Sequence, residues 1–175
     1  YRKINNIPDA WGTGATVQTM VFGNLNDKSG TGVAFTRNPS NGNKELYGEY
    51  LMNAQGEDVV AGIRTPLPLN KDASEDGNSL EVNHPNVYKE IIEISNKLES
   101  HFKEVQDIEF TIENEELYLL QTRNAKRTAQ ASVKIAIDMV NEEVVTKGEA
   151  LLMVDANNIT NLLHPQFIES QDKKF

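Results

Sequence analysis

Four polar side chains in one short stretch have the residue types and the spacing needed for chemistry. Asp107 and Glu109 alternate with apolar residues, and Gln121 and Arg123 occupy alternate positions a few residues later. This period-two pattern predicts two half-buried strands joined by an acidic turn. Carboxylate and amide oxygens suit a hard cation such as Mg²⁺, and a guanidinium suits a phosphate. The stretch predicts either a metal–nucleotide site or, more simply, an ordinary hairpin with a solvated outer face.

The shared-metal interpretation requires a particular strand register. If Glu109 and Gln121 serve one metal, they should lie directly opposite each other, which places Asp107 opposite Arg123. A slip by one residue would mix the two faces and bury charge. The connecting loop must then have three or five residues, although the acidic turn has no glycine for a left-handed position. The same register predicts three apolar-face pairs: Ile108 with Thr122, Phe110 with Leu120, and Ile112 with Tyr118.

Elements elsewhere in the chain must position this hairpin. Alternating patterns predict strands over 15–22, 32–37 and 45–52, separated by turn residues. Trp11 is expected to pack at the edge of the core, and the polar, acidic residues 69–83 are expected to form a surface loop. These features predict an α+β fold whose antiparallel sheet is extended by the hairpin.

Helices are expected on both sides of the hairpin in the sequence. Apolar residues from Val87 onward recur at spacings of three and four, which predicts an amphipathic helix starting near His84-Pro85 that covers one face of the sheet. Thr128 can cap a helix reaching about Glu143, and Thr146 with Glu149 fits a capping box for a second. Asp155 is expected to cap a third.

Length and composition restrict the classes of function. The chain has 175 residues, enough for one domain with an appendage, and a net charge of −9, which argues against a nucleic-acid backbone as partner. Because cysteine is absent, disulfides and thiolate metal sites are excluded. No apolar run approaches 18 residues and no signal-peptide pattern opens the chain, so a cytoplasmic location is expected. The start at Tyr1, without methionine, suggests a fragment of a longer protein.

Two other motifs have competing interpretations. The run Ser29-Gly30-Thr31-Gly32 suits either a phosphate-binding loop or a hairpin turn, and no GxxxxGK[ST] sequence supports the first. The three histidines, at positions 84, 101 and 164, have no metal-ligand spacing, so structural or solvated roles are expected for them. No Ser/His/Asp arrangement points to nucleophilic catalysis.

Longer runs resemble a known family. The runs SGTGVAFTRNPSNG, ELYGEYLMNAQGEDVVAGIRTP and DIEFTIENEELYLLQTRNAKRTAQASVKIAIDMVNE are similar to the pyruvate phosphate dikinase family, and the resemblance covers nearly the whole chain. Phosphoenolpyruvate synthases and glucan-water dikinases are related but match less closely. In the dikinase family an ATP-grasp domain phosphorylates a histidine on a swivelling domain, which exchanges the phosphoryl group with pyruvate or phosphoenolpyruvate at a distant barrel.

The resemblance implies roles for five residues. Glu109 and Gln121 would hold Mg²⁺ and phosphate oxygens of ATP, and Arg123 would act catalytically on the transferring phosphoryl group. Asp107 lies beside them as a further nucleotide-binding candidate, and Glu57 is a secondary one.

The resemblance also implies that this chain is one part of a larger enzyme. Residues 1–127 would be the second ATP-grasp lobe, and residues 128–175 a helical linker towards the histidine domain. The remaining lobe and the phosphohistidine domain would be its partners, and the isolated piece is expected to be inactive. Ala125 and Glu143 stand where the family has glycine.

A non-catalytic, acidic protein-interaction domain is the alternative. An interaction surface needs no fixed pairing of carboxylate, amide and guanidinium, and it would show exposed aromatic residues, which are few here. The pairing within the hairpin therefore separates the two hypotheses.

Overall fold

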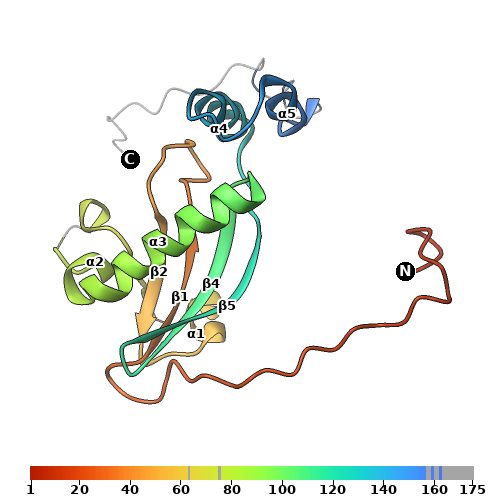
Figure 1. Ribbon diagram of the computed structural model, residues 1–175. Helices are drawn as coiled ribbons and strands as arrows, with labels where there is room; N and C mark the ends of the chain where they lie inside the picture. The colour runs from red at the N-terminus through yellow and green to blue at the C-terminus, as the bar shows by residue number, and fades with distance from the viewer. Residues whose placement is uncertain (63, 75, 157–158, 160–161, 163–175) are drawn as a thin grey trace, which may run out of the picture.

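The computed structural model describes residues 1–62, 64–74, 76–156, 159 and 162 (Figure 1). Its centre is an antiparallel sheet of five strands in the order β3-β2-β1-β4-β5. The predicted α+β fold with an antiparallel sheet is confirmed. The strands are β1 (Gly30–Phe35), β2 (Tyr47–Met52), β3 (Leu67–Pro68), β4 (Gln106–Glu113) and β5 (Glu116–Asn124).

Helix α3 (Pro85–Phe102) covers one face of the sheet, as predicted. Pro85 occupies the first turn, where its missing N–H leaves no hydrogen bond unmade. Val87 and Ile91 are buried on the side of the helix that packs against the sheet. Together with β4 and β2 they form the main core, which includes Ala34, Leu46, Tyr50, Leu69, Leu80, Ile108, Phe110 and Ile112.

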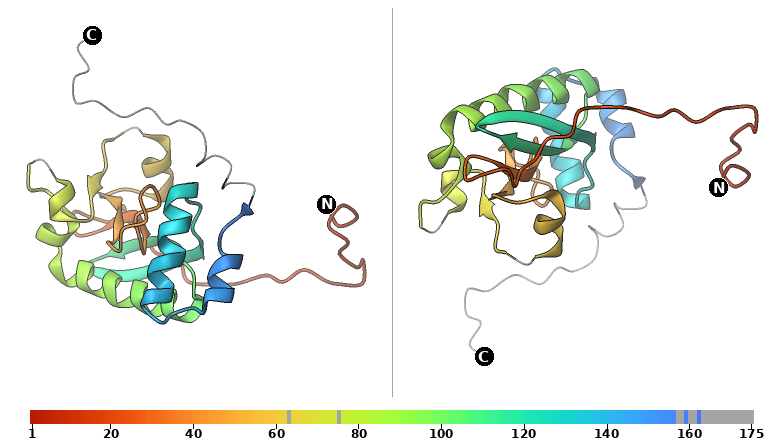
Figure 2. Two further views of the ribbon diagram at one scale, coloured as in Figure 1. Left: turned by 90° about the horizontal axis from the view of Figure 1, so that it is seen from above. Right: turned by 90° about the horizontal axis from the view of Figure 1, so that it is seen from below.

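The opposite face of the sheet is partly covered by the short helix α1 (Gly56–Ala61) (Figure 2). The Asp58 carboxylate accepts a hydrogen bond from the Gln55 N–H at 2.8 Å, and Gly62 ends the helix at a φ of 65°. Glycine adopts this left-handed conformation without steric penalty. Because α1 is only six residues long, its periodicity was too short to predict it.

The prediction of a plain surface loop over 69–83 is wrong in part. A 3-10 helix η1 (Lys71–Ala73) and a short α2 (Leu80–Asn83) form there, and the Ser79 hydroxyl caps α2 by accepting from the Val82 N–H. Leu69 and Leu80 are fully buried in the main core. The polar, acidic composition of the segment suggested a surface loop, although these two leucines attach it to the core.

Helices α4 (Ala129–Asn141) and α5 (Lys147–Leu152) stand at one end of the sheet (Figure 1). Thr128 caps α4 through the Ala131 N–H, and Thr146 and Glu149 form the predicted capping box of α5. Both helix predictions are confirmed. The two helices share a second core with the β4 and β5 ends of the sheet, made by Val105, Ala125, Ala131, Ile135, Ala136, Met139, Val145 and Ala150.

The predicted strand over 15–22 does not form, and this prediction is wrong. Residues 11–22 run as an extended arm away from the body of the protein (Figure 1). Trp11 is 65% exposed, so its expected place at the edge of the core is wrong too. An alternating pattern predicts extended backbone, but it does not say whether a neighbouring strand is present. The helix expected after Asp155 falls mostly outside the described residues.

Within the described residues, no helix has both the length and the apolar character to cross a membrane.

Candidate active site

The β4–β5 hairpin brings the four predicted residues together. Glu109 lies directly opposite Gln121, and Asp107 lies opposite Arg123, as the shared-metal interpretation required. Neighbouring residues on these strands belong to the α3-side core, so the four side chains occupy the other face of the sheet. That face is the one α1 partly covers.

Beyond Glu109 the predicted register is wrong. A bulge follows the Glu109–Gln121 pair, so that Phe110 faces Leu119 and Leu120 becomes the extra residue. The strands are joined by a two-residue turn at Asn114-Glu115, whose φ values are 52° and 69°. Two left-handed residues make the turn that suits a tight hairpin, and asparagine tolerates this conformation. The predicted loop of three or five residues is therefore wrong: the turn has two residues, and the extra residue lies in the bulge at Leu120.

Arg123 is held between two carboxylates. Its Nε donates a hydrogen bond to Asp107 Oδ2 at 2.7 Å, and its Nη2 lies 4.0 Å from Glu109 Oε1. The hydrogen bond to Asp107 raises the pKa of Arg123, and the charge of Glu109 adds to the effect. The Arg123 side chain is 60% exposed. It is therefore a fixed, permanently charged cation that an anion can reach from outside.

Glu109 and Gln121 fit a magnesium ion by the chemistry of their donors. Directly opposed residues on antiparallel strands have Cβ atoms about 5 Å apart, within reach of one bound ion. Mg²⁺ keeps several waters and uses few protein ligands, alongside phosphate oxygens of the substrate. The described part of the chain gathers no three His, Cys, Asp or Glu side chains as a metal cage. One carboxylate and one amide therefore match Mg²⁺ bound jointly with a phosphate.

A cavity of about 510 Å³ lies beside Glu109, between α1 and the sheet. Glu57 of α1 lines it, so the structure brings this secondary candidate to the same cavity as Glu109. Leu120 lines it as well, because the bulge places this residue next to the site. The remaining lining residues are small or apolar: Thr31, Gly32, Val33, Gly56, Val59 and Ala61. The cavity thus combines a mostly small and apolar lining with the two carboxylates of Glu57 and Glu109.

Sequence reasoning missed Leu120 and Val33 as part of this site. Both looked like ordinary strand residues, and only the bulge and the position of α1 bring them to the cavity. Larger hollows of about 680 and 780 Å³ lie elsewhere, at the α3 side and against α4 and α5. The candidate site is therefore chosen by its paired charged and amide groups, and not by the size of its cavity.

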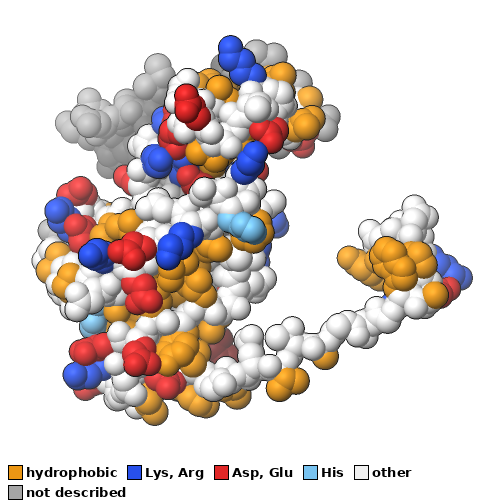
Figure 3. Space-filling model, in the orientation of Figure 1, with side chains coloured by type: hydrophobic (Ala, Val, Ile, Leu, Met, Phe, Trp, Pro, Cys, Tyr) orange, Lys and Arg blue, Asp and Glu red, His pale blue; other side chains and the backbone are white. Residues whose placement is uncertain are grey.

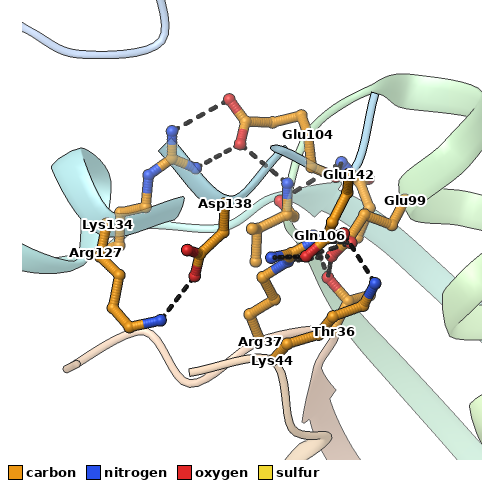
Figure 4. Close-up of polar contacts among 11 residues, drawn as sticks. Thr36, Arg37, Lys44, Glu99, Glu104, Gln106, Arg127, Lys134, Asp138 and Glu142 are labelled. Atoms are coloured by element: carbon orange, nitrogen blue, oxygen red, sulfur yellow. Dashed lines mark hydrogen bonds and ion pairs between the residues drawn. The ribbon is translucent and has the colours of Figure 1, made fainter. Parts of the chain in front are cut away.

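Sequence reasoning also missed a second, buried arginine cluster (Figure 4). Arg37 is fully buried and donates hydrogen bonds to both Glu99 oxygens, at 2.6–3.1 Å, and to both Glu142 oxygens, at 2.7 and 3.1 Å. Thr36 donates to Glu99 at 2.8 Å, and Lys44 donates to Glu142 at 2.7 Å. The cluster ties the end of β1 to α3 and to the end of α4.

The charges of this cluster stabilise one another. Burial alone would lower the pKa of Arg37, but its hydrogen bonds to Glu99 and Glu142 outweigh burial and raise it. Burial would raise the pKa of Glu142, but hydrogen bonds from Arg37 and Lys44 outweigh burial and lower it. No local sequence pattern predicts this cluster, because Arg37, Glu99 and Glu142 are far apart in the sequence.

A neighbouring pair holds α4 and α5 to the sheet. Arg127 forms an ion pair with Glu104, and it also donates to the Ser132 hydroxyl at 3.0 Å and to the Met153 carbonyl at 3.3 Å (Figure 4). A single guanidinium therefore joins the strand end to both helices.

The remaining motifs have structural roles. The run Ser29–Gly32 is neither a phosphate loop nor a turn, because Gly30–Phe35 is strand β1 and Ser29 is buried. The His84 ring packs edge-on against Tyr50, and that of His101 against Phe102. His164 lies outside the described residues.

Comparison with known proteins identifies a family. The family model described as "Pyruvate phosphate dikinase, AMP/ATP-binding domain" matches residues 1–87 and 69–144. The chain is 55% identical over 167 residues to pyruvate, phosphate dikinase of Clostridium symbiosum, covering 95% of this chain and 18% of that protein. It is 54% identical to the Rickettsia felis protein of the same name, covering 94% of this chain and 18% of the relative.

A plant relative gives a similar result. Pyruvate, phosphate dikinase 1, chloroplastic, of Oryza sativa is 54% identical over 167 residues, covering 95% of this chain and 17% of that protein. The chain thus spans less than a fifth of the length of these relatives. With the family model matching most of its residues, this chain belongs to the family of the pyruvate phosphate dikinase AMP/ATP-binding domain.

Proposed function

We propose that this chain is the lobe of a pyruvate, phosphate dikinase that holds the Mg²⁺-bound phosphates of ATP. In the whole enzyme, ATP would phosphorylate a histidine, and that histidine would exchange the phosphoryl group with pyruvate or phosphoenolpyruvate. The observation that supports the proposal is the placement of Glu109, Gln121 and Arg123 on one face of one hairpin. A protein-interaction surface would not need this pairing.

The proposed roles follow from the chemistry of phosphoryl transfer. The transferring group carries negative charge on its oxygens and needs positioning more than covalent help. Mg²⁺ held by Glu109 and Gln121 would neutralise part of that charge. Arg123, oriented by Asp107, would present a guanidinium to the same oxygens. Asp107 would act by holding the Arg123 side chain in one orientation through this hydrogen bond.

The cavity beside Glu109 is the proposed place for the nucleotide base. Its volume of about 510 Å³ lies within the range of small-molecule sites, and Val33, Val59 and Leu120 supply an apolar surface. Glu57 would then face the nucleotide from α1. The phosphates would extend from this cavity towards Arg123.

The organisation of the whole protein is part of the proposal. Residues 1–127 would form one ATP-grasp lobe, residues 128–175 a linker towards the phosphohistidine domain, and the other ATP-grasp lobe would complete the site. A cytoplasmic location is proposed as well, while the rice relative is named as chloroplastic.

The first test is the affinity of the isolated chain for MgATP. We expect weak binding by titration calorimetry, because half of the wall and the cations of the other lobe are missing. The net charge of −9 also opposes an anionic ligand at low salt. Micromolar affinity would show that the site is complete in this chain and that the two-lobe assignment is wrong.

The decisive test uses the full-length enzyme in single-turnover assays of its two half-reactions. Arg123→Ala should slow phosphorylation of the histidine by ATP by roughly two to four powers of ten, equivalent to about 3–5 kcal/mol. Glu109→Gln should slow the same half-reaction and raise the magnesium requirement. Transfer between phosphohistidine and pyruvate should be unchanged, because it takes place at a different site.

Lys28→Ala provides a matched control. Lys28 forms an exposed ion pair with Glu115 at the tip of the same hairpin, 3.3 Å apart, away from the proposed ligands. Its loss should leave both half-reactions intact. If Arg123→Ala slows both half-reactions equally, Arg123 supports the fold and the catalytic assignment is wrong.

A further inference from the structure

The cavity of about 680 Å³ on the α3 side of the sheet has no part in the proposed nucleotide site. One of its walls is a stripe of α3 residues at spacings of four, three and four, which share one side of the helix: Tyr88, Ile92, Ser95 and Glu99. The β1–β2 connection and the residues of η1 form the other walls. On this face, acidic and basic side chains lie close together over α2 and α3 (Figure 3).

Ser95 carries a polar atom that the fold does not use. The residue is 5% exposed, and its Oγ is the one buried side-chain polar atom of the described residues that makes no hydrogen bond. Burying a hydroxyl without a partner costs free energy, so such groups are rare in native proteins. Serine is also a weaker helix former than alanine, so helix propensity does not explain its presence in α3. A ligand with a polar group would explain it.

The surroundings of Ser95 favour an uncharged polar group at this end of the cavity. Glu99, one helical turn further along α3, accepts hydrogen bonds from Arg37 at 2.6–3.1 Å and from Thr36 at 2.8 Å (Figure 4). The carboxylate of Glu99 is therefore already neutralised and fully hydrogen-bonded. A ligand hydroxyl can bond to Ser95 here without adding a charge beside the Arg37 guanidinium.

The lining of the cavity as a whole is acidic. It contains four carboxylates and two ammonium groups: Glu45, Asp72, Glu81, Glu99, Lys44 and Lys71. Lys71 pairs with Glu81 at 3.4 Å, whereas Asp72 forms no ion pair in the part of the chain that the structure describes. Burial raises the pKa of Tyr88, and the charges of Glu81 and Asp72 raise it further. This negative charge beside Tyr88 favours a cation and opposes an anion.

We propose that this cavity binds a small linear amino alcohol, with its hydroxyl on Ser95 and its ammonium group at Asp72. Between Tyr88 and Ser95 the helix rises about 10 Å, a length that a six-carbon chain with a polar group at each end can span. Ile92 and Leu46 offer apolar surface to such a chain. The described residues gather no cage of three metal-ligating side chains, so an organic cation fits better than a metal ion.

The proposal goes beyond the nucleotide function and does not depend on it. The cavity and the hairpin site lie on opposite faces of the sheet. A bound ligand would join η1 to α3, and through Glu99 it would adjoin the Arg37 cluster.

Titration of the 175-residue chain, followed by the amide chemical shifts of Ser95 and Asp72, tests the proposal. The probe is 6-aminohexan-1-ol, and a ligand this small should bind at about millimolar concentration. Hexylamine lacks the hydroxyl and hexane-1,6-diol lacks the charge. Each control compound should therefore bind about fivefold more weakly, or weaker still.

Two substitutions separate the two ends of the ligand. Ser95→Ala should weaken binding of the amino alcohol by about fivefold and leave that of hexylamine unchanged. Asp72→Asn should weaken binding of both amines and leave that of the diol unchanged. Glu93→Gln is the matched control, because it removes one exposed carboxylate of α3 that does not line the cavity. It should leave all three affinities unchanged.

Urea titration without ligand checks the role of the hydroxyl. Ser95→Ala should not lower the free energy of unfolding, because it removes an unpartnered buried group and favours the helix. A clear fall would mean that the hydroxyl already has a partner in the folded chain, and the proposal would be wrong.

Three binding outcomes would also overturn the proposal. Shifts that do not saturate with the amino alcohol would mean that the cavity holds only water. Equal affinity for the diol would remove the role of the cation. An equal loss in Asp72→Asn and Glu93→Gln would show general attraction to an acidic protein. A failure of the nucleotide assays would change none of these results, so the two proposals can fail separately.

Discussion

Two arginines of this protein each lie between two carboxylates, and their surroundings differ completely. Arg37 has no exposed side-chain surface, and its guanidinium donates to Glu99 and Glu142 on two sides. The Arg123 side chain is 60% exposed, with one short hydrogen bond to Asp107 and a looser approach to Glu109. One guanidinium and two carboxylates thus form a buried ion cluster at one end of the sheet. The same combination on the face of the sheet leaves an exposed cation in a fixed orientation.

The difference indicates how to separate a structural ion cluster from a functional one. A structural guanidinium has protein acceptors on all sides, so nothing is left to bind a ligand. A functional guanidinium is fixed by one partner and keeps its other nitrogens accessible to an anion. By this criterion Arg123 is available for a phosphate, and Arg37 is not.

The largest expected effect is that of Arg37→Ala on stability. This change leaves Glu99 buried without its cation, which typically destabilises a protein by about 3–5 kcal/mol. Such a loss is a large part of the stability of a small domain. The free energy of unfolding, measured by urea titration of the 175-residue chain, should fall by that amount.

Arg123→Ala in the same titration completes this comparison. The Arg123 side chain is 60% exposed and makes one hydrogen bond, to the largely buried Asp107, whereas Arg37 is fully buried between two carboxylates, so the loss of Arg123 should destabilise the chain less than the loss of Arg37. If Arg123→Ala proves as destabilising as Arg37→Ala, exposure does not distinguish the two clusters and the criterion fails.

The charge of Glu142 is expected to make a smaller contribution to the free energy of unfolding, on the order of 1 kcal/mol. Since the folded state lowers the pKa of Glu142, its stabilisation is complete above the ordinary value of 4.5 and is lost as the pH falls below it. Glu142→Gln removes this contribution. The wild-type chain should therefore be more stable than the variant at pH 7, and the gap should shrink below pH 4.5 in urea titrations at several pH values. A gap that is the same at pH 7 and pH 3 would mean that the charge of Glu142 does not strengthen the cluster.

The smallest expected effect is a gain in stability from a substitution at Glu143, the residue after Glu142. Glu143 has a φ of 59°, a left-handed conformation that strains a side chain and suits glycine. Glu143→Gly should stabilise the chain by about 0.5–1 kcal/mol, measured as a rise in the thermal midpoint. Glu90→Gly, the same change inside α3, should destabilise the chain by about 1 kcal/mol. If both changes destabilise, the strain at Glu143 is relieved by its contacts.

Sequence patterns correctly predicted the helices and caps that depend on interactions between residues close together in the sequence. The α3 stripe and the caps at Thr128 and Thr146 depend on neighbouring residues, and all three appear in the structure. The strand predicted over 15–22 failed because a strand needs a neighbour, and the sequence pattern does not contain one. Glu143, noted as a departure from the family's glycine, coincides with a left-handed residue.

The candidate site was predicted as far as strand pairing could be worked out. Opposite placement of Glu109 and Gln121 follows from alternation and from keeping the apolar face unmixed. The bulge at Leu120 could not be deduced, because it depends on how a two-residue turn with two left-handed residues closes the hairpin. The Arg37 cluster was missed because its partners come from α3 and the end of α4, which only the tertiary fold brings together.

The two-residue turn of the β4–β5 hairpin has a consequence for folding kinetics. A hairpin closed by a tight turn forms in about 1–10 μs, whereas pairing β1 with β4 must first close a long loop. Asp107, Glu109, Gln121 and Arg123 all belong to this one fast element. Their mutual spacing therefore depends on one local pairing that can form early, while the rest of the sheet must form before the hairpin is held stably, since an isolated hairpin is only marginally stable.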